Sequence, residues 1–173
     1  SIGTGAFEGC SSLSSIDLPA GLTSIGRCAF ARCSALTSVT FPASLTSIGR
    51  GAFARCSALA SVTLPGLTSI GDWAFHRCSA LTSVTLPAGL TSIEDGAFFF
   101  CSALSSVTSS PPASPPSATT PSTAAPPLPV PAGLITIGSH AFYGCEALGS
   151  VTLPAGLTSI GSCAFYDCSS LVS

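Results

Sequence analysis

The sequence predicts a repeat solenoid, a right-handed superhelix with short parallel β-strands on one face and short helical or 3₁₀ turns on the other. One observation is a recurring Ala-Phe pair, whose successive spacings are 23, 23, 22, 23, 44 and 23 residues. A second is that the apolar positions of one unit fit neither a single helix nor a single strand. Such coils bury their apolar side only by stacking on one another. The phenylalanines of the pairs are Phe7, Phe30, Phe53, Phe75, Phe98, Phe142 and Phe165.

The unit at residues 22–42 shows how each coil is divided. Leu36, Val39 and Phe41 end in the alternation that is typical of a strand. Ala29-Phe30-x-x-Cys33 has a spacing that is compatible with a short helical turn. A glycine follows isoleucine once per repeat, with Glu94 as the exception, and is expected to serve the turn, while six prolines each follow a strand. We therefore expect one strand and one short helical turn in each coil.

The Ala-Phe spacing of 44 residues marks an insertion between two blocks of repeats. Residues 1–108 hold about five units, and residues 130–173 hold about two. Residues 109–129 contain eight of the 14 prolines, which favours a disordered or polyproline segment. Two units are too few to form a stable stack alone, so we expect this segment to loop out while the fifth unit stacks on the sixth. An O-glycosylated tract and a translated intron are alternative interpretations of the insertion.

The pattern L-x-x-I-G-x-x-A-F-x-x-C-x-x-L-x-x-V-x-L-P recurs in seven units and resembles the BspA-type, or Treponema-type, leucine-rich repeat family. The resemblance implies a leucine-rich repeat fold and a protein at the cell surface or secreted, active in adhesion or host interaction. It implies no shared catalytic site, so function is expected to depend on the variable positions of the repeat.

Composition excludes several other classes of protein. Only 7% of the 173 residues are charged and the net charge is −2, so there is no basic footprint for nucleic acid. No apolar run reaches about 18 residues, so we expect no membrane insertion in this segment. The chain starts and stops within the repeat pattern, which we interpret as a fragment of something longer.

Seven of the nine cysteines share one repeat position, where a buried small hydrophobic side chain is expected. Neighbours in this column are expected about 4.8 Å apart, which is farther than the usual Cβ separation in a disulfide. Cys28–Cys33 and Cys163–Cys168 are the local pairs that could be bridged. No cysteine spacing is typical of a zinc site, and no cofactor is expected. The column consists of Cys10, Cys33, Cys56, Cys78, Cys101, Cys145 and Cys168.

The sequence offers no catalytic constellation. His76 and His140 lie in different columns, and the acidic residues are scattered along the chain. A triad requires a nucleophile, a base and an orienting acid that converge, and abundant serines allow only coincidental sets. We therefore predict that the protein is not an enzyme.

The outward positions of the strands form a ladder of hydroxyl side chains. Threonine favours strands and is easily solvated, so the ladder has an ordinary structural interpretation. The functional interpretation is a neutral surface for a protein or glycan, with ice binding as a variant. The candidate binding residues are Ser38, Thr40, Ser61, Thr63, Ser83 and Thr85.

Two further columns are candidates. Looping out the insertion makes His76, Phe99, Tyr143 and Tyr166 consecutive neighbours in the column that follows the Ala-Phe pairs. Such an aromatic stripe either packs against neighbouring loops or forms an exposed patch for a partner. A basic row is formed by Arg32, Arg55 and Arg77. It is either a solvated edge or a surface that attracts an anionic partner.

The predicted function is therefore a non-enzymatic scaffold for protein interaction or adhesion, presenting repeat surfaces to a protein or glycan partner. The alternative is a passive structural repeat segment with no specific partner, with ice association through its Ser/Thr ladder as one variant.

Overall fold

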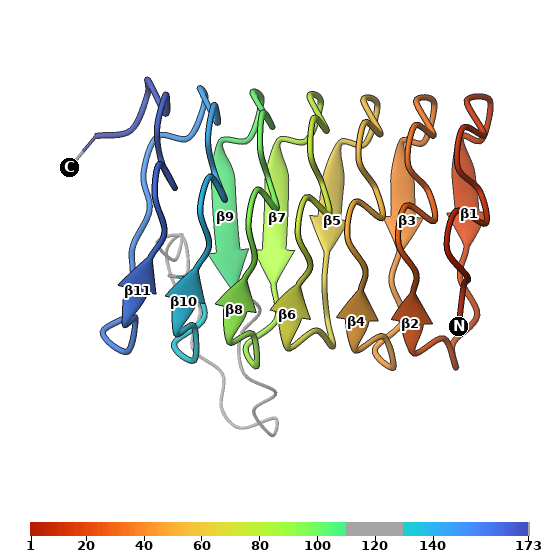
Figure 1. Ribbon diagram of the computed structural model, residues 1–173, viewed down its shortest axis with the longest axis horizontal. Helices are drawn as coiled ribbons and strands as arrows, with labels where there is room; N and C mark the ends of the chain where they lie inside the picture. Colours follow the sequence, from red (N-terminus) through yellow and green to blue (C-terminus); the bar gives the residue numbers. More distant parts are fainter. Residues whose placement is uncertain (110–129, 173) are drawn as a thin grey trace, which may run out of the picture.

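A computed structural model describes residues 1–109 and 130–172. The coils stack along one axis, with the N-terminus at one end and the C-terminal repeat at the other (Figure 1). The predicted insertion lies almost wholly outside the described residues, so the division into two blocks and a disordered segment stays a prediction.

One set of strands follows the predicted positions. It comprises β1 (Ser15–Asp17), β3 (Ser38–Thr40), β5 (Ser61–Thr63), β7 (Ser83–Leu86) and β9 (Ser106–Ser109). The strands pair in parallel and in register as two sheets, β1-β3 and β5-β7-β9. Each central isoleucine or valine faces the core, because alternate side chains of a strand point to opposite faces. The predicted parallel-strand solenoid is confirmed.

A second set of strands was not predicted. It comprises β2 (Ser24–Ile25), β4 (Ser47–Ile48), β6 (Ser69–Ile70), β8 (Ser92–Ile93), β10 (Thr136–Ile137) and β11 (Ser159–Ile160). These strands also pair in parallel, as β2-β4 and as β6-β8-β10-β11. Sequence reasoning missed them because two residues are too few to show an alternation of apolar and polar positions.

The coils on either side of the insertion are direct neighbours. Strand β10 pairs with β8, with Thr136 opposite Ser92 and Ile137 opposite Ile93. The rings of Phe98 and Phe142 stack at 5.3 Å between centroids. The hydrophobic core therefore continues across a gap of 44 residues in the sequence.

The expectation of helical or 3₁₀ turns was wrong, since the described residues contain no helix. Each coil has two positions, four residues apart, where the backbone adopts a positive φ, as at Gly5 (64°) and Gly9 (76°). A residue in this left-handed conformation ends a right-handed helical turn. Hence the part of each coil that was expected to be helical folds as successive β-turns. In the first coil, one turn is closed by the Glu8 N–H, which donates to the Gly5 carbonyl (3.0 Å), and another by the Cys10 N–H, which donates to the Phe7 carbonyl (3.1 Å).

Alternate amides along these turns bond to the next coil. The Phe30 N–H donates to the carbonyl of Ala52 (2.7 Å), while the Ala31 N–H closes a local turn on Cys28 (3.1 Å). The same alternation recurs at Phe53, whose N–H donates to Ala74 (2.8 Å). Backbone hydrogen bonds thus join coils on the turn face as well as along the strands, which satisfies groups that would otherwise be buried unpaired.

A ladder of seven phenyl rings forms the centre of the core. Neighbouring rings are nearly parallel, and their centroids lie 5.0–5.5 Å apart. The four rings Phe30, Phe53, Phe75 and Phe98 are fully buried. The Ala-Phe period therefore marks the core position around which each coil closes.

The cysteine column is buried as predicted from Cys33 onward, while Cys10 at the N-terminal end is exposed. All nine cysteines are free thiols, so the suggested Cys28–Cys33 and Cys163–Cys168 bridges are absent. Each buried thiol of the column donates to the carbonyl of the core phenylalanine one coil earlier, as from Cys56 to Phe30 at 3.1 Å. This position therefore favours cysteine because it needs a small apolar side chain that also donates a hydrogen bond.

The glycines after the isoleucines have a different role from the one predicted. Their φ angles are not positive, but a Cβ added at Gly26, Gly49 or Gly71 would lie 2.8 Å or less from backbone atoms of the preceding coil. The glycine is required by the close approach of two coils rather than by the turn. Glu94 replaces it in one coil, and the hydrogen bond there, from Glu94 N–H to the Ile70 carbonyl, is 3.0 Å, against 2.7 Å at Gly138.

Gly71→Ala is expected to destabilise the protein by roughly 1–3 kcal/mol, because the added methyl group would lie 2.5 Å from the carbonyl oxygen of Ile48 and the backbone must shift. Gly89→Ala is the matched control, since no atom lies within 4 Å of its added Cβ. Urea denaturation of both variants measures the difference. Equal stability of the two variants would contradict the close-approach explanation.

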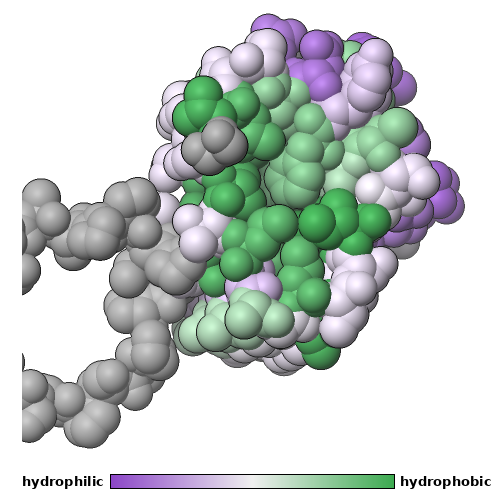
Figure 2. Space-filling view, turned by 90° about the vertical axis from the view of Figure 1, so that its left-hand side faces the viewer, coloured by the Kyte–Doolittle hydropathy of each residue, from purple (hydrophilic) through white to green (hydrophobic). Residues whose placement is uncertain are grey.

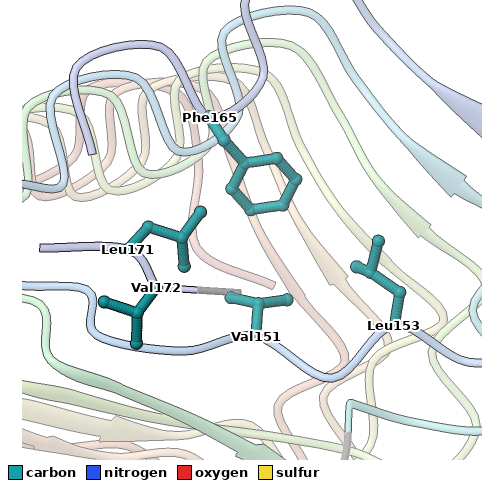
Figure 3. A pocket seen from close by; sticks show the side chains of 5 residues that line it. All are labelled: Val151, Leu153, Phe165, Leu171 and Val172. Atoms are coloured by element: carbon teal, nitrogen blue, oxygen red, sulfur yellow. The ribbon is translucent and has the colours of Figure 1, made fainter. Parts of the chain in front are cut away.

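The C-terminal end of the stack exposes core side chains. Viewed from this end, hydrophobic residues occupy the middle of the face, with hydrophilic residues along one edge (Figure 2). A hollow of about 340 Å³ opens there between Phe165, Leu171, Val172, Val151 and Leu153 (Figure 3). Phe165 is the last ring of the phenyl ladder, so this hollow is continuous with the core.

Candidate interaction surface

The structure brings the four predicted aromatic residues together. His76 and Phe99 meet edge to face at 5.5 Å, while Phe99 and Tyr143 stack at 4.9 Å, as do Tyr143 and Tyr166. They come from consecutive coils and follow directly on the buried Ala-Phe pairs, which fixes their spacing to that of the core rings. His76, Phe99 and Tyr143 are half-buried, and Tyr166 is 59% exposed.

Three more rings complete this group, which we call the aromatic surface. Trp73 lies 5.1 Å from Phe99, Phe100 lies 5.5 Å from Tyr143, and His140 lies 5.7 Å from Tyr143. Sequence reasoning missed them, although a signal existed. Each stands in one of the two positive-φ columns, where other coils carry glycine.

Glycines of the next coil make room for two of these rings. A Cβ at Gly96 would lie 2.6 Å from the ring of Trp73, and one at Gly144 would lie 2.7 Å from the ring of Phe100. The flat rings therefore lie against bare backbone. Ring-to-glycine packing pre-organises the aromatic surface, since rings held in this way have little conformational freedom left to lose on binding.

Electrostatics distinguish one end of the aromatic surface. The pKa of His76 is lowered, first by burial and then by the positive charges of Arg77 and Arg55. The Arg77 guanidinium also lies over the Phe100 ring, 5.7 Å from its centroid. The aromatic surface thus borders a positively charged region that keeps His76 neutral at lower pH than an ordinary histidine.

The Ser/Thr ladder lies on the other predicted columns, and its exposure varies along the stack. Ser38, Thr40, Ser61 and Thr63 are exposed, whereas the hydroxyls of β7 are half-buried. The sheet is interrupted between β3 and β5, and a groove of about 460 Å³ opens there. The groove is lined by Ser38, Val39, Thr40, Phe41, Ser61, Thr63 and Pro65.

Within residues 1–109 and 130–172, no group of three or more His, Cys, Asp or Glu side chains is arranged to hold a metal ion. The same residues contain no helix that is long and apolar enough to cross a bilayer.

The repeat pattern of the BspA type leucine rich repeat region matches this sequence in six copies, over residues 1–113 and 125–173. The chain belongs to the BspA-type leucine-rich repeat family. The resemblance identified from the repeat pattern is therefore confirmed. This leucine-rich repeat chain has no match among proteins with curated descriptions.

Solved leucine-rich repeat structures share the fold. The Treponema pallidum leucine-rich repeat protein has a TM-score of 0.84 and 31% identity, covering 99% of this chain and 71% of that one. A leucine-rich cell surface protein of Faecalibacterium prausnitzii has a TM-score of 0.57 and 30% identity, covering 98% and 57%. A leucine-rich repeat protein of Bacteroides ovatus, with a TM-score of 0.54 and 24% identity, shows the fold alone and covers 98% and 62%. The chain therefore spans less than two thirds of the length of the last two proteins.

Proposed function

We propose that this leucine-rich repeat chain is a non-enzymatic adhesion scaffold that binds a protein or glycan partner through the aromatic surface. The observation that supports this proposal is the gathering of seven rings, in contact with one another, at repeat positions that carry only non-aromatic residues in the other coils. A fold that needed only a solvated edge would repeat the small or polar residues of the other coils.

The composition of the aromatic surface suits recognition. Tryptophan, tyrosine and arginine are the residues most enriched among those that dominate binding energy at protein interfaces. The tryptophan and tyrosine rings provide a large contact area at a low cost in conformational entropy, because only two side-chain torsions are fixed. The Faecalibacterium prausnitzii relative is described as a cell surface protein, which agrees with a location where adhesion is useful.

Replacing Phe99 and Tyr143 together by serine tests the proposal. The two rings stack at 4.9 Å in the middle of the aromatic surface, so we expect the double variant to bind its partner at least about tenfold more weakly. The measurement is binding of the purified chain to an array of proteins and glycans, followed by surface plasmon resonance on the ligands that bind.

Ile135→Ser is the matched control, because it removes an apolar side chain that is 46% exposed and outside the aromatic surface. Circular dichroism of all variants establishes that the fold is intact. Binding that survives Phe99→Ser/Tyr143→Ser in a folded chain would contradict the proposal. Loss of binding in Ser61→Ala/Thr63→Ala instead would move the partner to the Ser/Thr ladder.

The ice-associated alternative has no comparable support. A row that matches an ice lattice must be regular, but the described ladder is divided between β3 and β5 and is half-buried along β7. We therefore propose no ice-binding function.

A further inference from the structure

The arginines of this chain are concentrated in one part of the stack. All five lie between residues 27 and 77, where Asp72 is the only acidic residue, although the whole chain has a net charge of −2. The other six acidic residues lie before or after this segment. The solenoid therefore has a positive middle section between negative ends, which composition alone conceals.

A groove of about 480 Å³ crosses four consecutive coils at the C-terminal side of this positive section. Arg55 and Arg77 line one end, Phe100 stands in the middle, and Glu146 lies at the far end. Ser57, Ser79 and Ser102 supply hydroxyls along the groove. Coils about 4.8 Å apart give it a length of roughly 14 Å, which matches four or five residues of an extended peptide.

The arginines occupy positions that favour glycine. Arg55 and Arg77 have φ angles of 62° and 57°, and the equivalent residues of the first and sixth coils, Gly9 and Gly144, are glycines. The turn therefore forms equally well with a residue that has no side chain. Non-glycine residues held in the left-handed backbone conformation cluster at functional sites, so the two arginines indicate that this position has a function.

The guanidinium groups are available to a ligand. Both arginines are exposed, and no ion pair within the described part of the chain engages them. Their charges act on His76, whose pKa they lower further than burial does alone. Arg77 is held over the Phe100 ring, which orients its planar donor face.

We propose that this groove binds an acidic peptide segment of the protein partner, with its carboxylates on Arg55 and Arg77, an apolar side chain against the exposed part of the Phe100 ring and a basic group at Glu146. Planar guanidinium groups bind carboxylates through two parallel hydrogen bonds. The reversal of charge along the groove fixes the polarity of the peptide. The inference rests on the proposed function, since it assigns a partner chemistry to the border of the aromatic surface.

The direct test is fluorescence polarisation with a labelled Glu-Glu-Leu-Ser-Lys peptide and its reversed sequence at low salt. We expect Arg55→Gln/Arg77→Gln to weaken binding of the preferred peptide at least tenfold. Arg27→Gln/Arg50→Gln is the matched control, because it removes the same charge outside the groove, and its loss should be threefold or less. Arg55→Lys/Arg77→Lys keeps the charge without the planar fork and should be intermediate. Glu146→Gln should weaken binding only of peptides that carry the lysine.

Several outcomes would overturn the inference. One is equal weakening by the two double glutamine variants, which indicates diffuse charge attraction. Another is binding of a sulfated oligosaccharide but not of either peptide, which assigns the groove to an acidic glycan. A third is the absence of peptide binding to the unmodified chain. If Phe99→Ser/Tyr143→Ser abolishes partner binding while Arg55→Gln/Arg77→Gln does not, the proposed function stands and this inference fails.

Discussion

Phe53→Ala is expected to destabilise the protein by about 3–5 kcal/mol, the usual range for removing a buried phenyl ring. Phe53 is fully buried between Phe30 (5.1 Å) and Phe75 (5.5 Å), with Phe41 edge-on at 5.4 Å. Its loss leaves a cavity that neighbouring coils cannot fill, since their spacing is fixed by backbone hydrogen bonds on both faces. Urea denaturation followed by circular dichroism measures the loss.

Phe7→Ala is the control for position in the ladder. Phe7 is half-buried and stacks on Phe30 alone, so its removal should cost clearly less than that of Phe53. Because each coil contacts only its neighbours, stability in such a stack is roughly a sum of coil and interface contributions. A loss below about 1 kcal/mol for Phe53→Ala would show that the ring does not organise the core.

Raising the pH above about 9 is expected to unfold the protein through its buried thiols. Burial raises the pKa of Cys56 to about 12, and the pKa values of Cys78, Cys101 and Cys145 are also raised by burial. An unfolded cysteine loses its proton near pH 8.5–9, so the unfolded state then binds fewer protons than the folded state. Stability is therefore full below pH 9 and falls as the pH rises towards the folded-state pKa values.

The expected slope is about 1.4 kcal/mol per pH unit for each thiol that stays protonated only in the folded state. Thermal melts between pH 8 and 11 under reducing conditions measure it. Cys78→Ala should flatten the slope by one such contribution, although it also removes the thiol hydrogen bond to the Phe53 carbonyl at 3.2 Å. A melting temperature that stays constant over this range would contradict the burial of the column.

The candidate surfaces were only partly predictable. The columns predicted that His76, Phe99, Tyr143 and Tyr166 are neighbours, because any residue that recurs once per coil meets its equivalent in the next coil. Two other columns hold Trp73 and Phe100 where other coils carry glycine, but only the structure shows that these rings join the aromatic surface by lying against Gly96 and Gly144. The groove beside Arg55 was only partly predictable. The sequence showed the arginine row, but only the structure shows that Ser57, Ser79, Ser102 and Glu146 from a second repeat position line a groove beside it.

The fold, too, was predictable from the sequence only in part. The period of 23 residues by itself determined the stack, the buried phenyl ladder and the buried cysteine column, because every coil must present the same apolar residues to its neighbours. Only the tertiary structure decided how the turns fold and where the second strands lie. The N–H groups of alternate turn residues bond to the next coil rather than within a helix, and that partner exists only once the coils have stacked.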